Sequence, residues 1–111
     1  MGTKEEVTVR SCNQVIAVAE SAIQPEDGEL LNLKYSLRCL TGPSGDTLYG
    51  LQVDKRHPNG HLIEREETHG LTSSIDEATA LAKVFAAGTV PPCVLLEMVD
   101  EWHDVYCSPA L

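Results

Sequence analysis

The fold is decided by the stretch from Ser74 to Tyr106, which reads SIDEATALAKVFAAGTVPPCVLLEMVDEWHDVY. Its pattern predicts two short helices joined by residues 88–92. Ser74 and Glu77 can form a capping box at the start of the first helix, and Gly88 is suited to end it. Pro92 is tolerated in the first turn of the second helix. Because strand signals come before this helix pair, we expect an α+β fold, an antiparallel β-meander of three or four strands with two C-terminal helices packed on one face.

Both predicted helices have an apolar stripe at helical spacing. In the first helix the stripe is Ile75, Ala78, Leu81, Ala82 and Phe85, and in the second it is Leu95, Met98, Val99, Trp102, Val105 and Tyr106. We expect the two stripes to bury Leu81, Phe85, Leu95, Val99 and Trp102 against the sheet. The opposite face of the second helix is acidic and holds Glu97, Asp100, Glu101 and Asp104.

The meander is predicted over residues 31–68. Apolar and polar residues alternate along residues 33–39 and again along residues 49–54, as in half-buried strands. His57-Pro58-Asn59-Gly60 is the strongest turn signal, because Pro58 suits a type I turn and Gly60 can take the left-handed conformation. The strand at residues 61–68 reads as an exposed edge protected by its charges.

Residues 1–28 are predicted to form an N-terminal arm or an extra strand. Glu6 to Arg10 alternates like an edge strand, with Val7 and Val9 on one face. Residues 13–24, which contain the apolar run from Val15 to Ala19, fit either a buried strand or a short helix. Periodicity does not decide between these alternatives over so few residues.

Length and charge limit the classes of function. The chain has 111 residues, which fits a single domain over residues 1–111. Its formal net charge of −9 argues against nucleic acid and against anionic membrane surfaces as partners. The N-terminus has no apolar segment typical of a signal peptide, and the run from Val15 to Ala19 is far too short to span a bilayer. We therefore expect a cytoplasmic protein.

The four cysteines are widely and irregularly spaced, so we expect reduced, structural thiols: they are Cys12, Cys39, Cys93 and Cys107. Cys93 is the best candidate for a reactive residue, since it lies near the start of the second helix, where the dipole favours a thiolate. His103 in the same segment is nearly three turns away, which disfavours a Cys–His dyad. Packing beneath the corner at Pro91 and Pro92 is the structural alternative, and the reactivity of Cys93 stays open.

Two of the histidines are candidate metal ligands. His57 and His61 flank the predicted turn and can face each other across the mouth of the hairpin, with Cys39 or His69 as a further zinc ligand. Histidines near a surface turn are more often solvated. We therefore expect no metal and no cofactor, and keep His57 and His61 as weak candidates only.

Carboxylates on the predicted edge strand raise the question of acid–base chemistry: Glu64, Glu66 and Glu67, with Asp54 on the neighbouring strand. Such chemistry needs a carboxyl in an apolar pocket, whereas Lys55, Arg56 and Arg65 can pair with these groups. Helix capping accounts for Ser74, and the glycine-rich turn at residues 42–45 lacks the lysine and helix of a phosphate-binding loop. We therefore expect no catalytic residues and no enzyme activity.

One pattern in the sequence combines a short strand motif with residues that lead into and form the last predicted helix. These residues are Tyr49-Gly50-Leu51, followed by Val90, Pro92, Leu95, Val99, Asp100, Glu101 and Trp102. The pattern resembles a family of short uncharacterised proteins from Clostridia and related Firmicutes, a domain of unknown function. The resemblance covers roughly Leu33 to Trp102. That family commonly has a histidine where this chain has Val94, so no role of such a histidine carries over. The resemblance implies a bacterial cytosolic protein and no particular activity.

The expected function is a small non-catalytic protein-interaction or regulatory module. The acidic face at Glu97, Asp100, Glu101 and Asp104 is the candidate surface for a basic protein partner. Self-association into a homodimer through the segment around Val7, Val9 and residues 15–18 is a further expectation. The alternative is a small-molecule or metal-binding protein that uses the cleft between sheet and helices near Cys93, or the His57/His61 hairpin.

Overall fold

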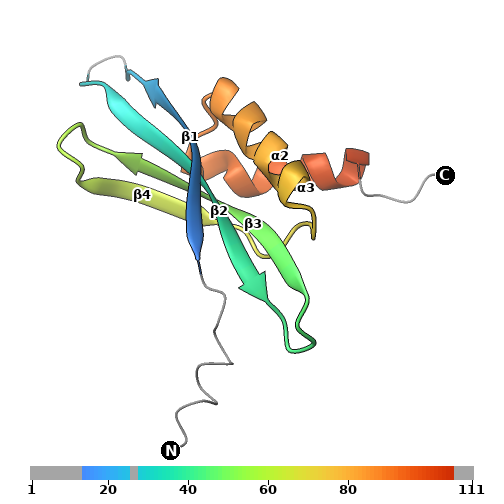
Figure 1. The fold of residues 1–111 in the computed structure, drawn as a ribbon. Helices are drawn as coiled ribbons and strands as arrows, with labels where there is room; N and C mark the ends of the chain where they lie inside the picture. Colours follow the sequence, from blue (N-terminus) through green and yellow to red (C-terminus); the bar gives the residue numbers. More distant parts are fainter. Residues whose placement is uncertain (1–13, 26–27, 107–111) are drawn as a thin grey trace, which may run out of the picture.

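The computed structural model describes residues 14–25 and 28–106, with side chains as far as Trp102. It contains a sheet of four strands and two C-terminal helices, which confirms the predicted α+β fold (Figure 1). The predicted strand at residues 6–10 lies outside the described residues. The elements are β1 (Val15–Ile23), β2 (Leu31–Thr41), β3 (Thr47–Arg56), β4 (Leu62–Glu67), α2 (Ile75–Ala87), the 3₁₀ helix η1 (Pro92–Val94) and α3 (Leu95–Tyr106).

The sheet is an antiparallel meander in the order β1-β2-β3-β4. The segment for which the sequence left strand and helix open is therefore a strand, β1. Its ladder with β2 shifts register between Ala17 and Ala19, so one extra residue is accommodated there as a bulge. The predicted edge strand is also confirmed, because β4 pairs with β3 alone among the described strands.

The helix pair covers one face of this sheet (Figure 1). On that face Tyr35 opposes Val53 and Leu37 opposes Leu51, so the alternating apolar residues of β2 and β3 form a continuous apolar surface. α2 packs across β1, β2 and β3, while η1 and α3 lie against β4. The buried core is made of Leu33, Tyr35, Leu37, Leu51, Val53, Ala78, Leu81, Ala82, Phe85, Ala86, Val90, Leu95 and Val99.

A buried hydrogen bond joins the sheet to the connection between the two helices. The hydroxyl of Tyr35, whose residue is 1% exposed, donates to the carbonyl oxygen of Val90 at 2.7 Å. Burial raises the pKa of the Tyr35 hydroxyl, so it stays protonated and remains a donor. Val90 comes immediately before the Pro91-Pro92 corner that turns the chain into η1. This bond therefore fixes where the second helix begins relative to the sheet.

The helix ends follow the sequence signals in part. The hydroxyl of Ser74 accepts from the backbone N–H of Glu77 at 3.1 Å, as predicted. The carboxylate of Glu77 does not reach back to the backbone of Ser74, because it accepts the hydroxyl of Thr72 at 2.6 Å instead. Gly88 is the C-cap of α2, but Thr89 rather than a glycine has the positive φ of 50°.

Three predictions about the helices need correction. Ile75 belongs to the apolar stripe of the first predicted helix but is 44% exposed, because it is the first residue of α2. Trp102 is only partly buried, at the margin of the core. Pro92 begins the short 3₁₀ helix η1, and α3 itself starts at Leu95. Leu81, Phe85, Leu95 and Val99 are buried as expected.

Gly50 allows the chain to cross closely over β3 after β4. A Cβ atom at Gly50 would lie 2.5 Å from the carbonyl oxygen of His69 and 2.8 Å from the hydroxyl of Thr68. The neighbouring Tyr49 then bridges to Thr72, with its N–H donating to the Thr72 carbonyl at 2.7 Å. A glycine in a strand often marks such an approach of backbone, and here it guides the chain from β4 towards α2.

Replacing Tyr35 by phenylalanine tests the bond between the sheet and the helix connection. Tyr35→Phe leaves the Val90 carbonyl buried without its partner, so we expect a loss of about 1–3 kcal/mol in the free energy of unfolding, measured by urea denaturation. Tyr49→Phe is the matched control, since Tyr49 is half-buried and its hydroxyl has no hydrogen-bond partner among the described residues. Equal losses in both variants would show that the Tyr35–Val90 bond contributes nothing specific.

Candidate functional site

The two helices leave an open apolar groove between them. Its cavity volume is about 460 Å³. On α2 the residue pairs at i and i+4 are Ala80 with Val84 and Leu81 with Phe85, and on α3 the pair is Met98 with Trp102, so both helices present apolar ridges to the groove. Its walls are Glu77, Ala80, Leu81, Val84, Phe85, Met98, Glu101 and Trp102. We call these eight residues the α2–α3 groove.

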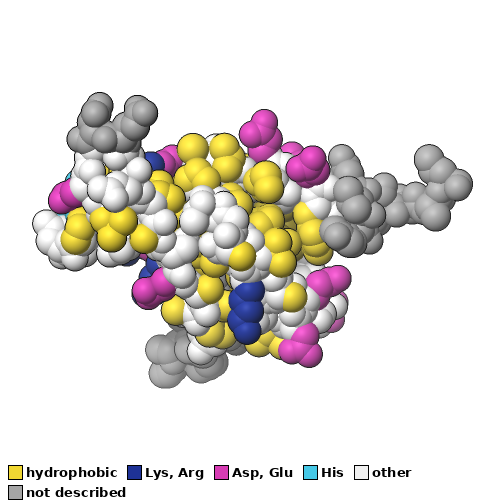
Figure 2. Space-filling model, turned by 90° about the horizontal axis from the view of Figure 1, so that it is seen from above, with side chains coloured by type: hydrophobic (Ala, Val, Ile, Leu, Met, Phe, Trp, Pro, Cys, Tyr) yellow, Lys and Arg dark blue, Asp and Glu magenta, His cyan; other side chains and the backbone are white. Residues whose placement is uncertain are grey.

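Val84 is the most exposed large apolar residue of the groove, with 64% of its surface accessible. The side of the molecule where α2 lies shows hydrophobic side chains gathered across it, with Asp and Glu side chains around them and Lys or Arg side chains among them (Figure 2). Sequence reasoning missed Ala80 and Val84 because they lie outside the buried stripe of α2. The signal that could have found them is their spacing, since two apolar residues at i and i+4 off the core stripe form a second, exposed stripe.

The predicted acidic surface meets this groove at Glu101. Glu97, Asp100 and Glu101 are all exposed on α3, and Glu101 is part of the groove wall. None of the three carboxylates forms an ion pair with a side chain that the structure describes. Asp104, the fourth predicted residue, has a side chain outside the described part. The structure therefore brings three of the predicted residues together on the exposed side of one helix.

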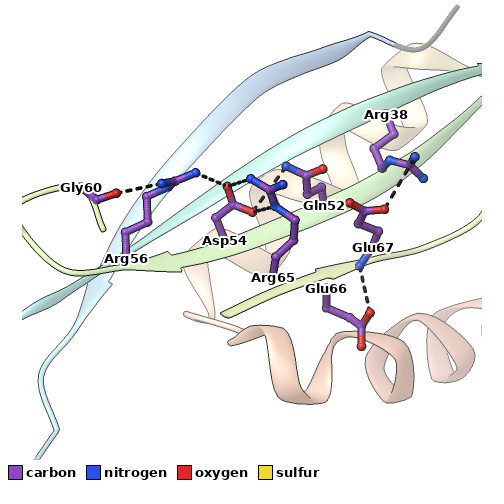
Figure 3. A network of polar contacts seen from close by, with 8 residues as sticks. All are labelled: Arg38, Gln52, Asp54, Arg56, Gly60, Arg65, Glu66 and Glu67. Carbon is purple, nitrogen blue, oxygen red and sulfur yellow. Dashed lines mark hydrogen bonds and ion pairs between the residues drawn. The ribbon is translucent and has the colours of Figure 1, made fainter. Parts of the chain in front are cut away.

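The opposite face of the sheet, which no described helix covers, carries an ionic network centred on Asp54 (Figure 3). The Asp54 side chain is only 5% exposed. Its two oxygens accept from Arg65 Nε at 2.7 Å and from a terminal nitrogen of Arg65 at 3.0 Å, which is a bidentate pair. Arg56 donates at 3.1 Å and the Gln52 amide at 3.4 Å. Long arginine side chains thus cover the carboxylate that they neutralise.

The network sets the protonation state of Asp54. Burial raises the pKa of this carboxyl, but hydrogen bonds and charge from Arg65 and then Arg56 outweigh that effect and hold the pKa below its usual range. Asp54 in turn raises the pKa of Arg65. A carboxyl held in this way stays ionised at neutral pH and has no proton to donate there. The Asp54 network is therefore suited to stabilising the sheet.

The other carboxylates considered for acid–base chemistry are also engaged. Glu64 pairs with Lys55 at 3.3 Å, and Glu67 lies 3.7 Å from Arg38 across the sheet. Glu66 accepts the backbone N–H of Glu67 at 3.1 Å. The cationic partners expected from the sequence are therefore present, and Arg38 is an additional one.

The two predicted metal candidates do face each other across the hairpin. The ring centroids of His57 and His61 are 6.0 Å apart, and Gly60 closes the turn with a φ of 95°. His57 Nδ1 also lies 3.4 Å from a carboxylate oxygen of Glu29, whereas His69 Nδ1 contacts the carbonyl oxygen of Gly70. Among the described residues, no three His, Cys, Asp or Glu side chains are grouped as metal ligands.

The cysteines differ in environment. Cys39 is buried, as a structural thiol should be, but Cys93 is exposed in η1. The predicted packing of Cys93 beneath the proline corner is therefore wrong, because Pro92 itself fills the buried position there. Cys12 and Cys107 lie outside the described residues.

The length and apolar composition of the helices bear on whether one of them can cross a membrane. In the part of the chain that the structure describes, no single helix is both long and apolar enough to cross a bilayer. The segments Ile75–Ala87 and Pro92–Trp102 reach the necessary length and composition only when taken together, and they are bent by 120° relative to each other.

Comparison with protein families identifies one match. The model of a family of unknown function, DUF6514, matches residues 14–105, which extend from the start of β1 to the end of α3. Because the match spans well over half of the chain, the chain belongs to this family. No curated protein and no solved structure matches it. This match agrees with the expected resemblance in that both are to a family of unknown function.

The geometry around Asp54 predicts a pH dependence of stability. The folded-state pKa is lower than that of the unfolded chain, so the Asp54 network stabilises the fold above the unfolded pKa of about 4 and loses this contribution as pH falls through the folded value. In Asp54→Asn we expect a lower free energy of unfolding at pH 7 and a shallower decline between about pH 5 and pH 2. Asp46→Asn, in an exposed turn, is the control. An unchanged pH profile in Asp54→Asn would refute this role.

Proposed function

We propose that this member of the DUF6514 family is a non-catalytic protein-interaction module that binds a basic, amphipathic segment of another protein in the α2–α3 groove. The observation that carries the proposal is the combination of an open apolar groove with an acidic border. An amphipathic helix lying in such a groove is a common mode of peptide recognition.

The shape and the lining of the groove support a helical segment as the occupant. Apolar residues from two helices form its walls, and the cavity of about 460 Å³ is open to solvent along the helices. Val84 is 64% exposed although it is a branched apolar residue. Covering it and the neighbouring Trp102 with apolar side chains of a partner would remove this surface from water, which favours binding.

The charge of the protein favours a basic partner. The chain carries a formal net charge of −9. On the open face of the sheet, Asp54 and Glu67 are paired with Arg side chains, and on the other face Glu64 is paired with Lys55. On α3, Glu97, Asp100 and the groove residue Glu101 have no such counterion among the described side chains. Their uncompensated field would attract Lys and Arg of a partner and accelerate association.

The same proposal includes a non-catalytic role in the cytoplasm. The carboxylates best placed for chemistry are paired with cations, and the pKa of Asp54 is lowered rather than raised. The exposed Cys93 thiol fits a reducing compartment.

A small-molecule binder is the second candidate function. Its support is the volume of the α2–α3 groove, about 460 Å³, which lies within the range of roughly 300–1,000 Å³ that is typical of ligand pockets. This candidate makes no use of the acidic border, so the charge of the partner distinguishes the two proposals.

Trp102 provides a direct test, because it is the single tryptophan of the chain and lines the groove. The probe is a synthetic amphipathic helical peptide of Leu and Lys, compared with its Leu and Glu counterpart. We expect only the basic peptide to change the fluorescence of Trp102, with a dissociation constant that rises with salt concentration. Val84→Asn should weaken binding by about tenfold, since it replaces an apolar contact by an amide that loses its hydration when the peptide covers it.

Two variants with the same change of net charge separate the groove from the overall charge. Glu101→Lys alters the groove wall, whereas Glu29→Lys lies by the His57 hairpin. We expect Glu101→Lys to weaken the basic peptide by about tenfold and Glu29→Lys to leave its affinity nearly unchanged. Equal binding of both peptides, or equal loss in both variants, would contradict the proposal. Binding of the apolar dye anilinonaphthalene sulfonate with no response to either peptide would favour the second candidate.

A further inference from the structure

We infer that the outer edge of β1 pairs with the β1 strand of a second copy of this chain and makes a two-fold symmetric dimer. The two edges of the sheet differ in how they are protected. β4 carries Glu64, Arg65, Glu66 and Glu67, and η1 and α3 lie against it. β1 has Glu20 as its one charged residue, and no described strand pairs with its outer side. Charged residues are a usual protection of an edge strand, and β1 has one where β4 has four; α2 packs on the core face of β1 and leaves its outer backbone edge open to a strand.

The apolar character of β1 adds to this contrast. Its sequence is VIAVAESAI, in which eight of the nine residues are uncharged. A chain with a net charge of −9 repels its own copies over most of its surface. Because β1 holds a single charged residue, two copies that approach along this edge bring few like charges face to face. An identical strand is also the partner that a two-fold axis supplies directly.

The ladder of β1 indicates which residues can pair. The Cys39 N–H donates to the Gln14 carbonyl at 2.9 Å, so residue 14 directs its backbone groups towards β2. Following the antiparallel alternation through the register shift, Ala19, Ser21 and Ile23 also face β2. Glu20 and Ala22 then direct their N–H and C=O groups outwards. The regular edge available for pairing is therefore Ala19–Ile23, on one side of the bulge.

In an antiparallel pairing centred on Ser21, the hydrogen bonds are made by Glu20 and Ala22, the two residues whose backbone groups point outwards. Glu20 of each copy then lies opposite Ala22 of the other, in hydrogen-bonded pairs on the open face of the sheet. This register keeps each Glu20 opposite a small neutral residue rather than opposite its own equivalent. The two-fold axis is perpendicular to the sheet, so the product is one continuous sheet with both helix pairs on the same face. The two α2–α3 grooves would then be presented side by side.

The test is the dimer dissociation constant from sedimentation equilibrium on the full chain, with charge changes at Ala22. Ala22→Glu sets two glutamates opposite each other twice per dimer, so we expect the dissociation constant to rise by about tenfold or more. Ala22→Lys sets a lysine opposite Glu20 twice, so the constant should fall. Within one chain Ala22 lies diagonal to Lys34 on β2 and two residues from Glu20 on the same face of β1, so the charges on the two sides offset each other. Urea denaturation of both variants measures any remaining change of monomer stability, and an opposite shift of the dissociation constant beyond that change reports on the pairing.

Ala87→Glu, an exposed alanine on α2, is the matched control and should leave the dissociation constant unchanged. A monomer at about 100 μM would overturn the inference. Two Ala22 variants that shift the constant in the same direction would overturn it as well, and so would an Ala87→Glu effect equal to that of Ala22→Glu. None of these results depends on the peptide experiments, so the dimer and the groove can fail separately.

Discussion

The arrangement of the structure depends on the buried contact between Tyr35 and Val90. Tyr35 belongs to the second strand of the sheet and Val90 to the connection between the helices, 55 residues later in the chain. Its hydroxyl satisfies a carbonyl that would otherwise be buried without a partner, at the point where the chain turns at Pro91 and Pro92. The apolar face of the sheet requires a cover of helices, and this contact determines where the second helix of that cover starts. The groove exists because α3 leaves this corner at an angle and does not close over α2.

Residues alternate between the two faces of the sheet, and the two faces are stabilised in different ways. Along β3, Leu51 and Val53 enter the core, while Gln52 and Asp54 on the other face are covered by arginine side chains. The ionic face therefore needs no helix, and its carboxylates are neutralised. The acidic residues of α3 are not neutralised in this way by described side chains. No contact within the described part of the fold explains why these carboxylates are there. We therefore assign them to the binding of a partner.

Much of the fold could be predicted from local patterns. The alternation in β2 and β3, the turn at His57 to Gly60 and the Ser74 cap all act over a few residues, and the structure has them where expected. The strand at residues 15–23 could not be predicted with certainty, because its identity depends on pairing with β2. The groove was also missed, since Ala80 and Val84 become neighbours of Met98 and Trp102 only after the Pro91-Pro92 turn. The acidic residues of α3 were identified, but the apolar surface beside them was not.

The most direct test of the account is to map the binding surface by nuclear magnetic resonance. In a titration of the ¹⁵N-labelled full chain with the Leu and Lys peptide, the account predicts amide and indole shift changes concentrated on the α2–α3 groove, at Ala80, Val84, Met98 and Trp102. Residues of the ionic face, such as Gln52 and Arg65, should not shift. Changes centred on the ionic face, or spread evenly over all acidic surfaces, would contradict the central claim that the groove is the interaction site.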